Sequence, residues 1–291
     1  MNDINKILLG TAQLGLSYGI NNKIGKPSFE SATEILKAAY QHGVCFLDTA
    51  EAYGNAHEII GSFHVSNINK FHIITKLSEA PLQHHGDITK AVEADIKKLN
   101  IDKLYGFLFH SIELYQNFFD RRTFSALKEK NKIQKVGVSI YTNEQALMVA
   151  EDKDIDIVQL PFNLLDNMNL RGSVLQILKA KGKEVHVRSV FLQGLLFMQE
   201  DELPQKLKPL YRYIKDIHII CKQLNLSVQQ LALSYVLQND LIDKVLIGVE
   251  SLPQLYDHIN FLKSKAPSKS KLEKINSISV KEKELLIPTN W

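Results

Sequence analysis

The sequence predicts one α/β domain folded as a closed (β/α)8 TIM barrel. Short β-rich runs alternate with amphipathic runs from residue 7 to residue 262. Strands that alternate with helices form a parallel sheet, because each helix returns the chain to the same end of the sheet. Eight such units in about 260 residues fit a closed barrel better than an open sheet. No linker divides the 291-residue chain near its middle, so we expect a single domain over residues 1–291.

The expected strands are short runs rich in apolar, β-branched and aromatic residues. They cover residues 7–12, 45–48, 71–76, 104–110, 136–140, 155–160, 185–190 and 244–249.

The expected helices carry apolar residues three or four positions apart, which places those residues on one helix face. Ile88, Val92, Ile96 and Leu99 show this spacing clearly. The helices cover residues 28–43, 57–63, 87–99, 118–130, 144–151, 174–180, 210–224, 227–238 and 253–262. The barrel core is therefore expected at about residues 7–262. The Lys- and Ser-rich residues 266–291 are expected to form a short, mostly solvated tail.

The composition excludes several classes of protein. The chain is 45% hydrophobic and 23% charged, as in an average soluble domain. Its net charge of +3 is too weak and too evenly spread to predict a nucleic acid or membrane partner. No apolar run approaches the roughly 18 residues of a membrane span, and the first residues lack signal-peptide character. Cys45 and Cys221 both lie in apolar segments, which favours a reducing, cytoplasmic location.

Two glycine-containing segments lack the spacing of a phosphate-binding loop. Residues 10–15 do not match the G-x-G-x-x-G pattern that an open-sheet dinucleotide-binding protein carries after its first strand. Residues 19–27 resemble a P-loop only superficially, because the spacing is one residue too long and Pro27 replaces the Mg²⁺-binding hydroxyl. We also expect no metal site, because the His84-His85 pair has no third ligand at metal-binding spacing.

Four polar side chains follow the ends of three consecutive strands. Asp48 ends the second strand and Tyr53 lies in the loop after it, while Lys76 and His110 end the third and fourth strands. The C-terminal ends of barrel strands meet on the face that carries the chemistry in TIM-barrel enzymes. An acid, a phenol, an amine and an imidazole are therefore expected around one small volume.

These four groups suit the reduction of a carbonyl group. A buried lysine is costly unless it is paired, and Asp48 can pair with Lys76. The ammonium would also lower the pKa of the Tyr53 phenol from its usual value of about 10. His110 can add a hydrogen bond at the same oxygen. The set favours a reaction that places negative charge on a carbonyl oxygen and then protonates it.

The segment around Asp48 and Tyr53 resembles the signature of the aldo-keto reductase superfamily. Residues 47–61 match its pattern D-T-A-x-x-Y-G followed by E-x-x-I-G. Further blocks similar to those of the family follow in the same order at residues 74–76, 108–110, 137–139, 159–163, 193–196 and 248–254. The resemblance covers roughly residues 7–262. The opening residues 9–15 and 25–28 resemble a bacterial branch associated with sugar and surface-polysaccharide metabolism, which implies a sugar-like substrate.

The resemblance implies an NAD(P)H-dependent enzyme that reduces aldehydes or ketones. Tyr53 would be the general acid, Lys76 paired with Asp48 would lower its pKa, and His110 would orient the carbonyl group. Ser139 and Gln159 would hold the nicotinamide carboxamide. The implied cofactor-binding residues are Gly10, Thr11, Asp48, Ser139, Gln159, Arg188, Ser189, Phe191, Leu192, Gln193, Gly194, Gly248, Glu250, Gln254 and His258.

Three departures from the family pattern concern the cofactor. Arg188 stands where an aromatic ring commonly stacks on the nicotinamide, and its charge would disfavour the oxidised ring. Gly248 and Gln254 stand where many NADPH-binding members have Lys and Arg. Glu250 would repel a 2′-phosphate or accept a hydrogen bond from a 2′-hydroxyl. NADPH is the cofactor that the family implies, and NADH stays open.

The regions around the barrel carry further expectations. The hairpin that closes the barrel bottom in many members is absent or reduced, because the first strand starts almost at once. The loop over residues 162–172, with Arg171, is expected to determine substrate specificity. Trp291 either folds over the active face or ends a frayed terminus.

Two other functions stay open from the sequence alone. The chain could be a cofactor-binding barrel that regulates a partner, as the potassium-channel β subunits of this superfamily do. It could also form a Schiff base at Lys76, although a paired Asp48 would keep that amine charged and non-nucleophilic. The oligomeric state does not follow from the sequence.

Overall fold

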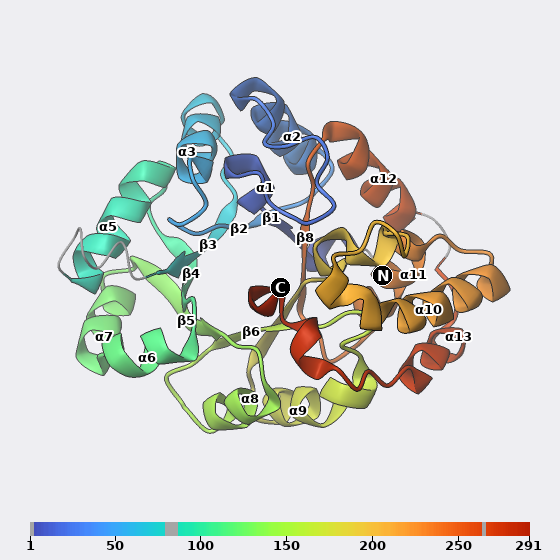
Figure 1. Cartoon of the computed structure of the whole chain (residues 1–291). Helices are drawn as coiled ribbons and strands as arrows, with labels where there is room; N and C mark the ends of the chain where they lie inside the picture. The colour runs from blue at the N-terminus through green and yellow to red at the C-terminus, as the bar shows by residue number, and fades with distance from the viewer. Residues whose placement is uncertain (1–2, 79–86, 264–265) are drawn as a thin grey trace.

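The computed structural model describes residues 3–78, 87–263 and 266–291. It confirms the predicted barrel: eight parallel strands follow one another in chain order and close through pairing of the first with the last (Figure 1). The strands are β1 (Ile7–Gly10), β2 (Phe46–Asp48), β3 (His72–Leu77), β4 (Leu104–Phe109), β5 (Ile133–Ser139), β6 (Ile157–Pro161), β7 (Glu184–Arg188) and β8 (Lys244–Gly248).

The helices surround the barrel, as Figure 1 shows. They are α1 (Ala12–Gly15), α2 (Phe29–Gln41), α3 (Ala56–Ser66), α5 (Ile88–Leu99), α6 (Ile112–Phe118), α7 (Arg121–Glu129), α8 (Asn143–Ala150), α9 (Met168–Ala180), α10 (Tyr211–Leu224), α11 (Val228–Leu237), α12 (Leu252–Lys263) and α13 (Lys269–Leu272). No helix in the described ranges is both long enough and apolar enough to cross a membrane.

Side-chain caps set several of the helix boundaries. Ser28 accepts a hydrogen bond from the Ser31 N–H, so α2 begins at the next residue, Phe29. Asp120 accepts one from the Thr123 N–H and starts α7, so the helix expected over residues 118–130 is shortened. These boundaries follow from the short polar side chains at the caps.

Side chains on each strand alternate between the barrel interior and the surrounding helices. Leu8, Ile74, Leu108 and Ile157 form an interior cluster, against which Phe46 also packs. A much larger apolar cluster fills the space between the strands and the helices.

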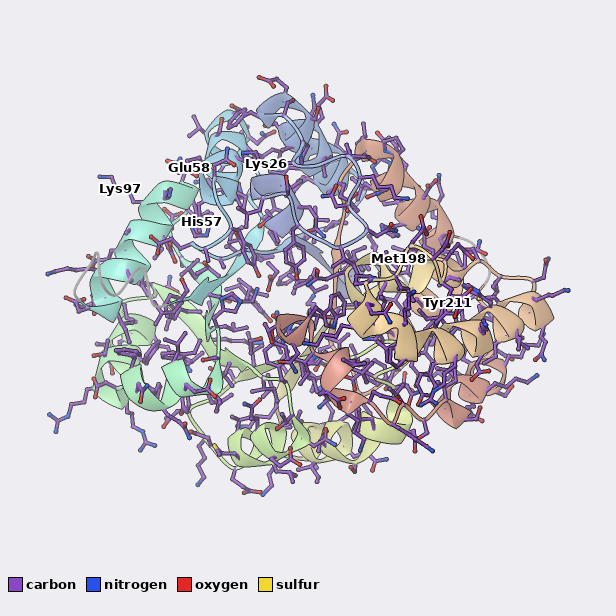
Figure 2. All side chains as sticks on the ribbon, in the orientation of Figure 1. Lys26, His57, Glu58, Lys97, Met198 and Tyr211 are labelled. Atoms are coloured by element: carbon purple, nitrogen blue, oxygen red, sulfur yellow. The ribbon has the colours of Figure 1, made fainter. Side chains whose placement is uncertain are left out.

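A buried polar network connects β3 to the helices α3 and α5. The Thr75 hydroxyl lies 3.3 Å from Nε2 of His57, and Nδ1 of His57 lies 3.3 Å from the Asp95 carboxylate. Figure 2 shows His57 on α3 directed toward α5, while Lys97 on α5 points outward. This network fixes the strand that carries Lys76.

Arg171 lies in helix α9, so the loop expected over residues 162–172 is shorter than predicted and does not include it. Asn167 caps α9, which therefore begins six residues earlier than predicted and includes Arg171. The guanidinium is 5% exposed and donates to both carboxylate oxygens of Asp166 at 2.6 and 2.8 Å. It also donates to the carbonyl oxygen of Tyr141 and the side chain of Asn143. With these contacts, Arg171 ties the segments after β5 and β6 together.

Part of the segment after residue 266 packs against the barrel while many of its residues stay exposed, which refines the predicted tail. Six apolar side chains of this segment are buried: Leu272, Ile275, Ile278, Val280, Leu285 and Leu286. The Asn167 side-chain amide donates to the carbonyl oxygens of Ile275 and Ile278 at 3.0 and 2.9 Å. The tail is therefore held against the barrel by α9.

The end of the chain lies over the centre of the barrel in Figure 1. The Trp291 indole N–H donates to the Leu285 carbonyl oxygen at 2.8 Å, and its ring packs against the main apolar cluster. Trp291 is thus folded back rather than frayed, although it does not line the cavity described below.

At the other end of the barrel, the described chain before β1 is the single turn Asp3–Lys6, without a hairpin. A polar cluster lies at this end. The Tyr105 hydroxyl is 3.0 Å from both Glu184 carboxylate oxygens, and Lys135 also contacts Glu184. His186 lies 2.7 Å from the same carboxylate.

Candidate active site

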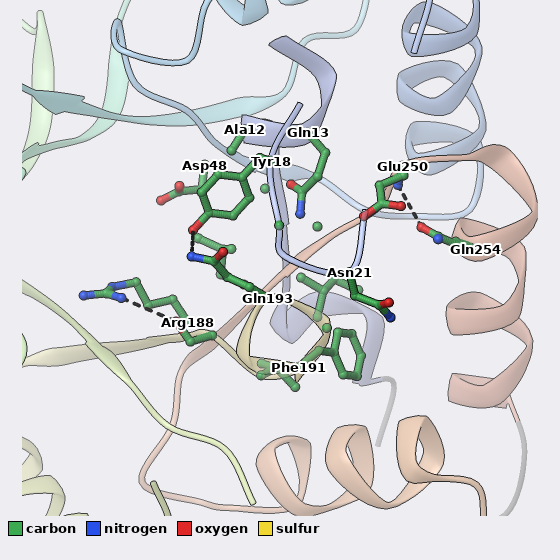
Figure 3. A pocket seen from close by; sticks show the side chains of 18 of the residues that line it. Ala12, Gln13, Tyr18, Asn21, Asp48, Arg188, Phe191, Gln193, Glu250 and Gln254 are labelled. Carbon is green, nitrogen blue, oxygen red and sulfur yellow. Dashed lines mark hydrogen bonds between the residues drawn. The ribbon is translucent and has the colours of Figure 1, made fainter. Parts of the chain in front are cut away.

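A cavity of about 260 Å³ opens at the C-terminal ends of the strands. Its walls come from the strand ends, from the loop after β1 and from the loop after β7. Figure 3 shows this arrangement: Asp48 and Arg188 lie on one side of the cavity, and Glu250 and Gln254 lie on the other. This is the face on which the sequence predicted the chemistry.

Strand register brings Asp48 and Lys76 together. Asp48 pairs with Ile74 of the neighbouring strand, and Ile74 faces the barrel interior. Lys76, two residues further along β3, faces the interior too. Its ammonium contacts the Asp48 carboxylate, and the two residues are only 2% and 1% exposed. The second carboxylate oxygen accepts a hydrogen bond from Gln159 Nε2 at 2.8 Å.

Lys76 also reaches Tyr53. Its Nζ lies 3.3 Å from the phenol oxygen and donates to it, so both groups line the same cavity. Burial opposes the charge on Lys76, but the Asp48 carboxylate beside it outweighs burial and raises the pKa of the amine. Lys76 is therefore an ammonium at neutral pH, which disfavours formation of a Schiff base at this amine.

Tyr53 keeps its proton more firmly than the sequence predicted. Burial raises the pKa of the phenol above its usual value, and the nearby Lys76 ammonium offsets only part of this effect. The expectation of a lowered pKa was wrong because it omitted desolvation. At neutral pH the phenol is protonated and can donate a proton.

His110 lies beside Tyr53 but does not line the cavity itself. Its ring centre is 6.2 Å from that of Tyr53, in an edge-to-face arrangement. Burial and the neighbouring Lys76 ammonium lower the pKa of His110 to about 4. The imidazole is therefore neutral at physiological pH and retains one ring N–H as a donor.

Most of the residues predicted to bind the cofactor line this one cavity. They are Gly10, Asp48, Gln159, Arg188, Ser189, Phe191, Gln193, Gly194, Gly248, Glu250, Gln254 and His258. Thr11, Ser139 and Leu192 are buried and do not line it. The Thr11 hydroxyl instead donates to the Asp48 carbonyl oxygen at 3.0 Å, which joins the ends of β1 and β2.

One buried polar atom in the wall of the cavity lacks a partner. Gln159 uses its Nε2 to hold Asp48, but its Oε1 is buried and has no hydrogen-bond partner within the described structure. A buried carbonyl oxygen without a donor is unfavourable, so this atom is suited to accept a hydrogen bond from a ligand.

The loop after β7 has an unusual backbone. Ser189, Leu192, Gln193 and Gly194 all have positive φ angles, between 48° and 88°. Such conformations are costly for residues other than glycine and often occur at binding sites. A Cβ atom on Gly194 would also meet Asn21 at 2.6 Å, so the close approach of the two loops requires glycine there.

The loop after β1 contributes residues that the sequence did not predict. Gln193 donates through its side-chain amide to the Tyr18 hydroxyl at 3.1 Å, and its carbonyl oxygen accepts from the Asn21 N–H at 3.4 Å. Tyr18, Asn21 and Gln13 all line the cavity. The turn-forming Gly19 and Gly25, both at positive φ, were the only sequence signal for this folded loop.

Arg188 lines the cavity on the same side as Asp48. Its guanidinium carbon lies 4.2 Å from the centre of the Tyr141 ring, and Nη2 donates to the Ile140 carbonyl oxygen at 3.3 Å. No ion pair of Arg188 is found within residues 3–78, 87–263 and 266–291. Among the described residues, its guanidinium therefore has no carboxylate within ion-pair distance.

The far end of the cavity is lined by acids, amides and a neutral histidine. The side-chain Oε1 of Gln254 accepts a hydrogen bond from the Glu250 main-chain N–H at 2.8 Å. The His258 ring stacks on Phe191 with ring centres 5.3 Å apart, and its Nδ1 lies 2.8 Å from the Gln229 amide. Burial lowers the pKa of His258 to about 4, so the ring is uncharged at neutral pH.

No group of three His, Cys, Asp or Glu side chains suited to a metal occurs in the part of the chain that the structure describes. The His84-His85 pair lies outside the described residues.

Solved structures of bacterial and environmental origin share this fold. The aldo-keto reductase AKR11C1 from Bacillus halodurans, in its holo form, matches with a TM-score of 0.76 and 18% identity, over 94% of this chain and 92% of that one. The glycerol dehydrogenase AKR11B4 from Gluconobacter oxydans matches with a TM-score of 0.71 and 20% identity, over 94% and 90%. MGS-M4, an aldo-keto reductase from a Medee basin deep-sea metagenome library, gives 0.68 and 16%, over 94% and 90%.

At these identities the solved structures show a common fold only. Among curated proteins, none matches the chain closely enough to be counted as a relative. The sequence model of the aldo/keto reductase family, however, matches residues 6–280, which is nearly the whole chain. The protein therefore belongs to the aldo/keto reductase family.

Proposed function

We propose that the protein reduces an aldehyde or ketone to an alcohol with NAD(P)H, and that Tyr53 is the proton donor. The observation that carries this proposal is the buried contact of Asp48, Lys76 and Tyr53 in one cavity. The three groups hold a protonated phenol against a fixed ammonium, which suits protonation of a carbonyl oxygen.

The residues of the cavity fit a nicotinamide dinucleotide. The unpartnered Gln159 Oε1 can accept a hydrogen bond from a carboxamide, next to the catalytic cluster. The strained backbone over residues 189–194 and the glycines on the cavity walls suit close approach of a pyrophosphate to main-chain N–H groups. When bound, the cofactor would supply a hydride to the carbonyl carbon of the substrate.

Tyr53 would supply the matching proton. Because Lys76 Nζ donates to the phenol oxygen, the phenol hydrogen is left to point at the substrate oxygen. As that proton leaves, negative charge develops on the phenol oxygen beside the ammonium, which stabilises it. Asp48 keeps Lys76 charged and in place throughout.

His110 would act on the same substrate oxygen without donating a proton. The neutral imidazole beside Tyr53 can contribute a hydrogen bond from its ring N–H and so orient the carbonyl group. The partner that we propose is a small carbonyl compound of sugar-like character. We also propose a cytoplasmic location, which the free thiols of Cys45 and Cys221 support.

Cofactor binding and turnover test this proposal separately. Isothermal titration with NADH and NADPH should give saturable binding of at least one of them. A panel of aldehydes, ketones and keto-sugars should then oxidise the bound cofactor over many turnovers. The absence of binding by either cofactor would refute the proposal.

A regulatory barrel is the competing function. For a regulatory barrel, one equivalent of cofactor should bind, and no carbonyl compound in the panel should give more than a single turnover. Nothing in the site favours this reading, because Asp48, Tyr53, Lys76 and His110 are all present.

A further inference from the structure

We propose that this chain selects NADH over NADPH by charge at the far end of its cavity. This inference rests on the proposed function, because it concerns the same cavity and the same cofactor. The observation behind it is the distribution of charged side chains along the cavity wall.

The cavity has two chemically different ends. Asp48, Tyr53, Lys76 and Gln159 line one end, where hydride and proton transfer would occur. A dinucleotide with its nicotinamide at this end extends its adenosine toward the other end, past the loop after β7. Figure 3 shows Glu250 and Gln254 at that opposite end.

The Lys and Arg side chains that line the cavity both lie at the end where hydride and proton transfer would occur. Lys76 and Arg188 are the only Lys or Arg side chains among the described residues that line it. Lys76 contacts the Asp48 carboxylate and donates to the Tyr53 hydroxyl. Arg188 lies over the Tyr141 ring and donates to the Ile140 carbonyl oxygen. Neither cation therefore lies where it could bind a phosphate at the far end of the cavity.

The far end offers carboxyl and amide groups instead. Glu250 and Asp257 line it together with Gln229, Gln254 and His258. The His258 ring does not supply a positive charge, because it is buried against Phe191 and Gln229 and stays neutral. Among the described residues that line it, this end of the cavity therefore carries the carboxyl groups of Glu250 and Asp257 and no Lys or Arg side chain.

A 2′-phosphate and a 2′-hydroxyl respond oppositely to this environment. A phosphate monoester carries a charge of about −1.5 to −2 at neutral pH and is normally bound by Arg or Lys. A hydroxyl can donate a hydrogen bond to a carboxylate, as the ribose of NAD does in other dinucleotide-binding proteins. Glu250 thus favours the 2′-hydroxyl and repels the 2′-phosphate. Attraction of one ligand together with repulsion of its competitor produces specificity.

Equilibrium titration of the full-length protein tests the preference without relying on turnover. We expect the Kd for NADH to be at least about 10-fold lower than that for NADPH at low salt. The ratio should shrink as salt is raised, because screening weakens the repulsion of the phosphate. Tighter binding of NADPH would overturn this inference and leave the proposed function intact, whereas no binding of either cofactor would overturn both.

Fragments of the cofactor test the adenosine-binding end of the cavity separately from the nicotinamide-binding end. Adenosine 5′-monophosphate and adenosine 2′,5′-bisphosphate differ only in the 2′-phosphate. The first should displace bound NADH at a lower concentration than the second, and the reverse order would contradict the inference. This comparison uses the unmodified protein, so it does not depend on the folding of a variant.

A substitution identifies the residue responsible. Glu250→Gln removes the charge with little change of shape and should reduce the preference for NADH at least about threefold, mainly by tightening NADPH. Glu129→Gln, on the exposed face of α7, is the matched control and should leave the ratio unchanged. An unchanged ratio in Glu250→Gln would show that Glu250 does not determine the preference.

Discussion

Lys76 and Asp48 are buried as a pair, and the chemistry proposed for Tyr53 depends on both. Breaking a buried ion pair by removing one partner leaves an uncompensated charge, whereas removing both charges is much less costly. The same pair also positions the ammonium 3.3 Å from the phenol oxygen. Removing both charges of the pair should therefore preserve stability better than removing one, whereas either change should abolish catalysis.

We expect Lys76→Met to lower the free energy of unfolding by about 3 kcal/mol and to abolish measurable turnover. The double variant Asp48→Asn with Lys76→Met should recover most of the stability but none of the turnover. Urea unfolding and cofactor oxidation measure the two effects. Lys97→Met, at an exposed position on α5, is the control. Equal stability of the single and double variants would contradict the buried-pair account.

Arg188 should make the site discriminate between the redox states of its cofactor. The guanidinium of Arg188 pairs with no carboxylate among the described residues. Its charge repels an oxidised, positively charged nicotinamide more than a reduced, neutral one. The protein should therefore bind the reduced form more tightly, and Arg188→Gln should narrow the ratio of the two Kd values at least about threefold. Isothermal titration measures both, with the exposed Arg122→Gln as control. A ratio unaffected by Arg188→Gln would rule this role out.

Among the elements, the two ends of the strands perform different tasks. The C-terminal ends and the loops after β1 and β7 form the cavity. The N-terminal ends carry the cluster of Tyr105, Lys135, Glu184 and His186. Although burial opposes ionisation of Glu184, its contacts with His186 and Lys135 lower the pKa of that carboxyl to about 2.

This cluster predicts a loss of stability in acid. Because the pKa of Glu184 is lower in the folded state than its ordinary value of 4.5, ionisation stabilises the fold above pH 4.5. The stabilisation is lost as the pH falls from 4.5 toward about 2. Glu184→Gln should remove on the order of 2 kcal/mol of this pH dependence. Urea unfolding at about pH 3 to 7 measures this loss. The exposed Glu93→Gln should behave like the unmodified protein. A variant with an unchanged pH dependence would show that Glu184 makes no such contribution.

At the scale of the whole molecule, the C-terminal segment is part of the fold. Asn167 both caps α9 and holds the carbonyl oxygens of Ile275 and Ile278, so one side chain joins the tail to the barrel. Asn167→Ala should lower the free energy of unfolding by about 2 kcal/mol, because it removes a cap and leaves buried carbonyl groups unpaired. The neighbouring exposed Asn169→Ala should have little effect. Denaturant unfolding of both variants checks this, and equal stabilities would contradict the link.

The sequence predicted the barrel and the meeting of Asp48, Tyr53 and Lys76 at one end of it, because both follow local rules. Strand and helix periodicity specifies the alternating elements, and strand ends place Asp48, Lys76 and His110 on one face. The sequence could not reveal which way the pKa of Tyr53 moves, because that depends on how deeply the assembled site buries the phenol.

Features that depend on contacts between distant segments were missed. The pairing of Arg171 with Asp166, the packing of the tail and the contact of Tyr18 with Gln193 all require the folded arrangement of loops. The tail nevertheless carried a signal, since Leu272, Ile275 and Ile278 recur every third residue among lysines and serines. Lysine and serine content alone therefore underestimated its burial.

The central claim is that Tyr53 donates the proton in carbonyl reduction, and one comparison tests it most directly. Tyr53→Phe should lower turnover by about 10²–10⁴-fold while changing the Kd of the preferred cofactor less than about threefold. The exposed Tyr256→Phe should keep both values. Full turnover in Tyr53→Phe, with cofactor binding intact, would contradict the account.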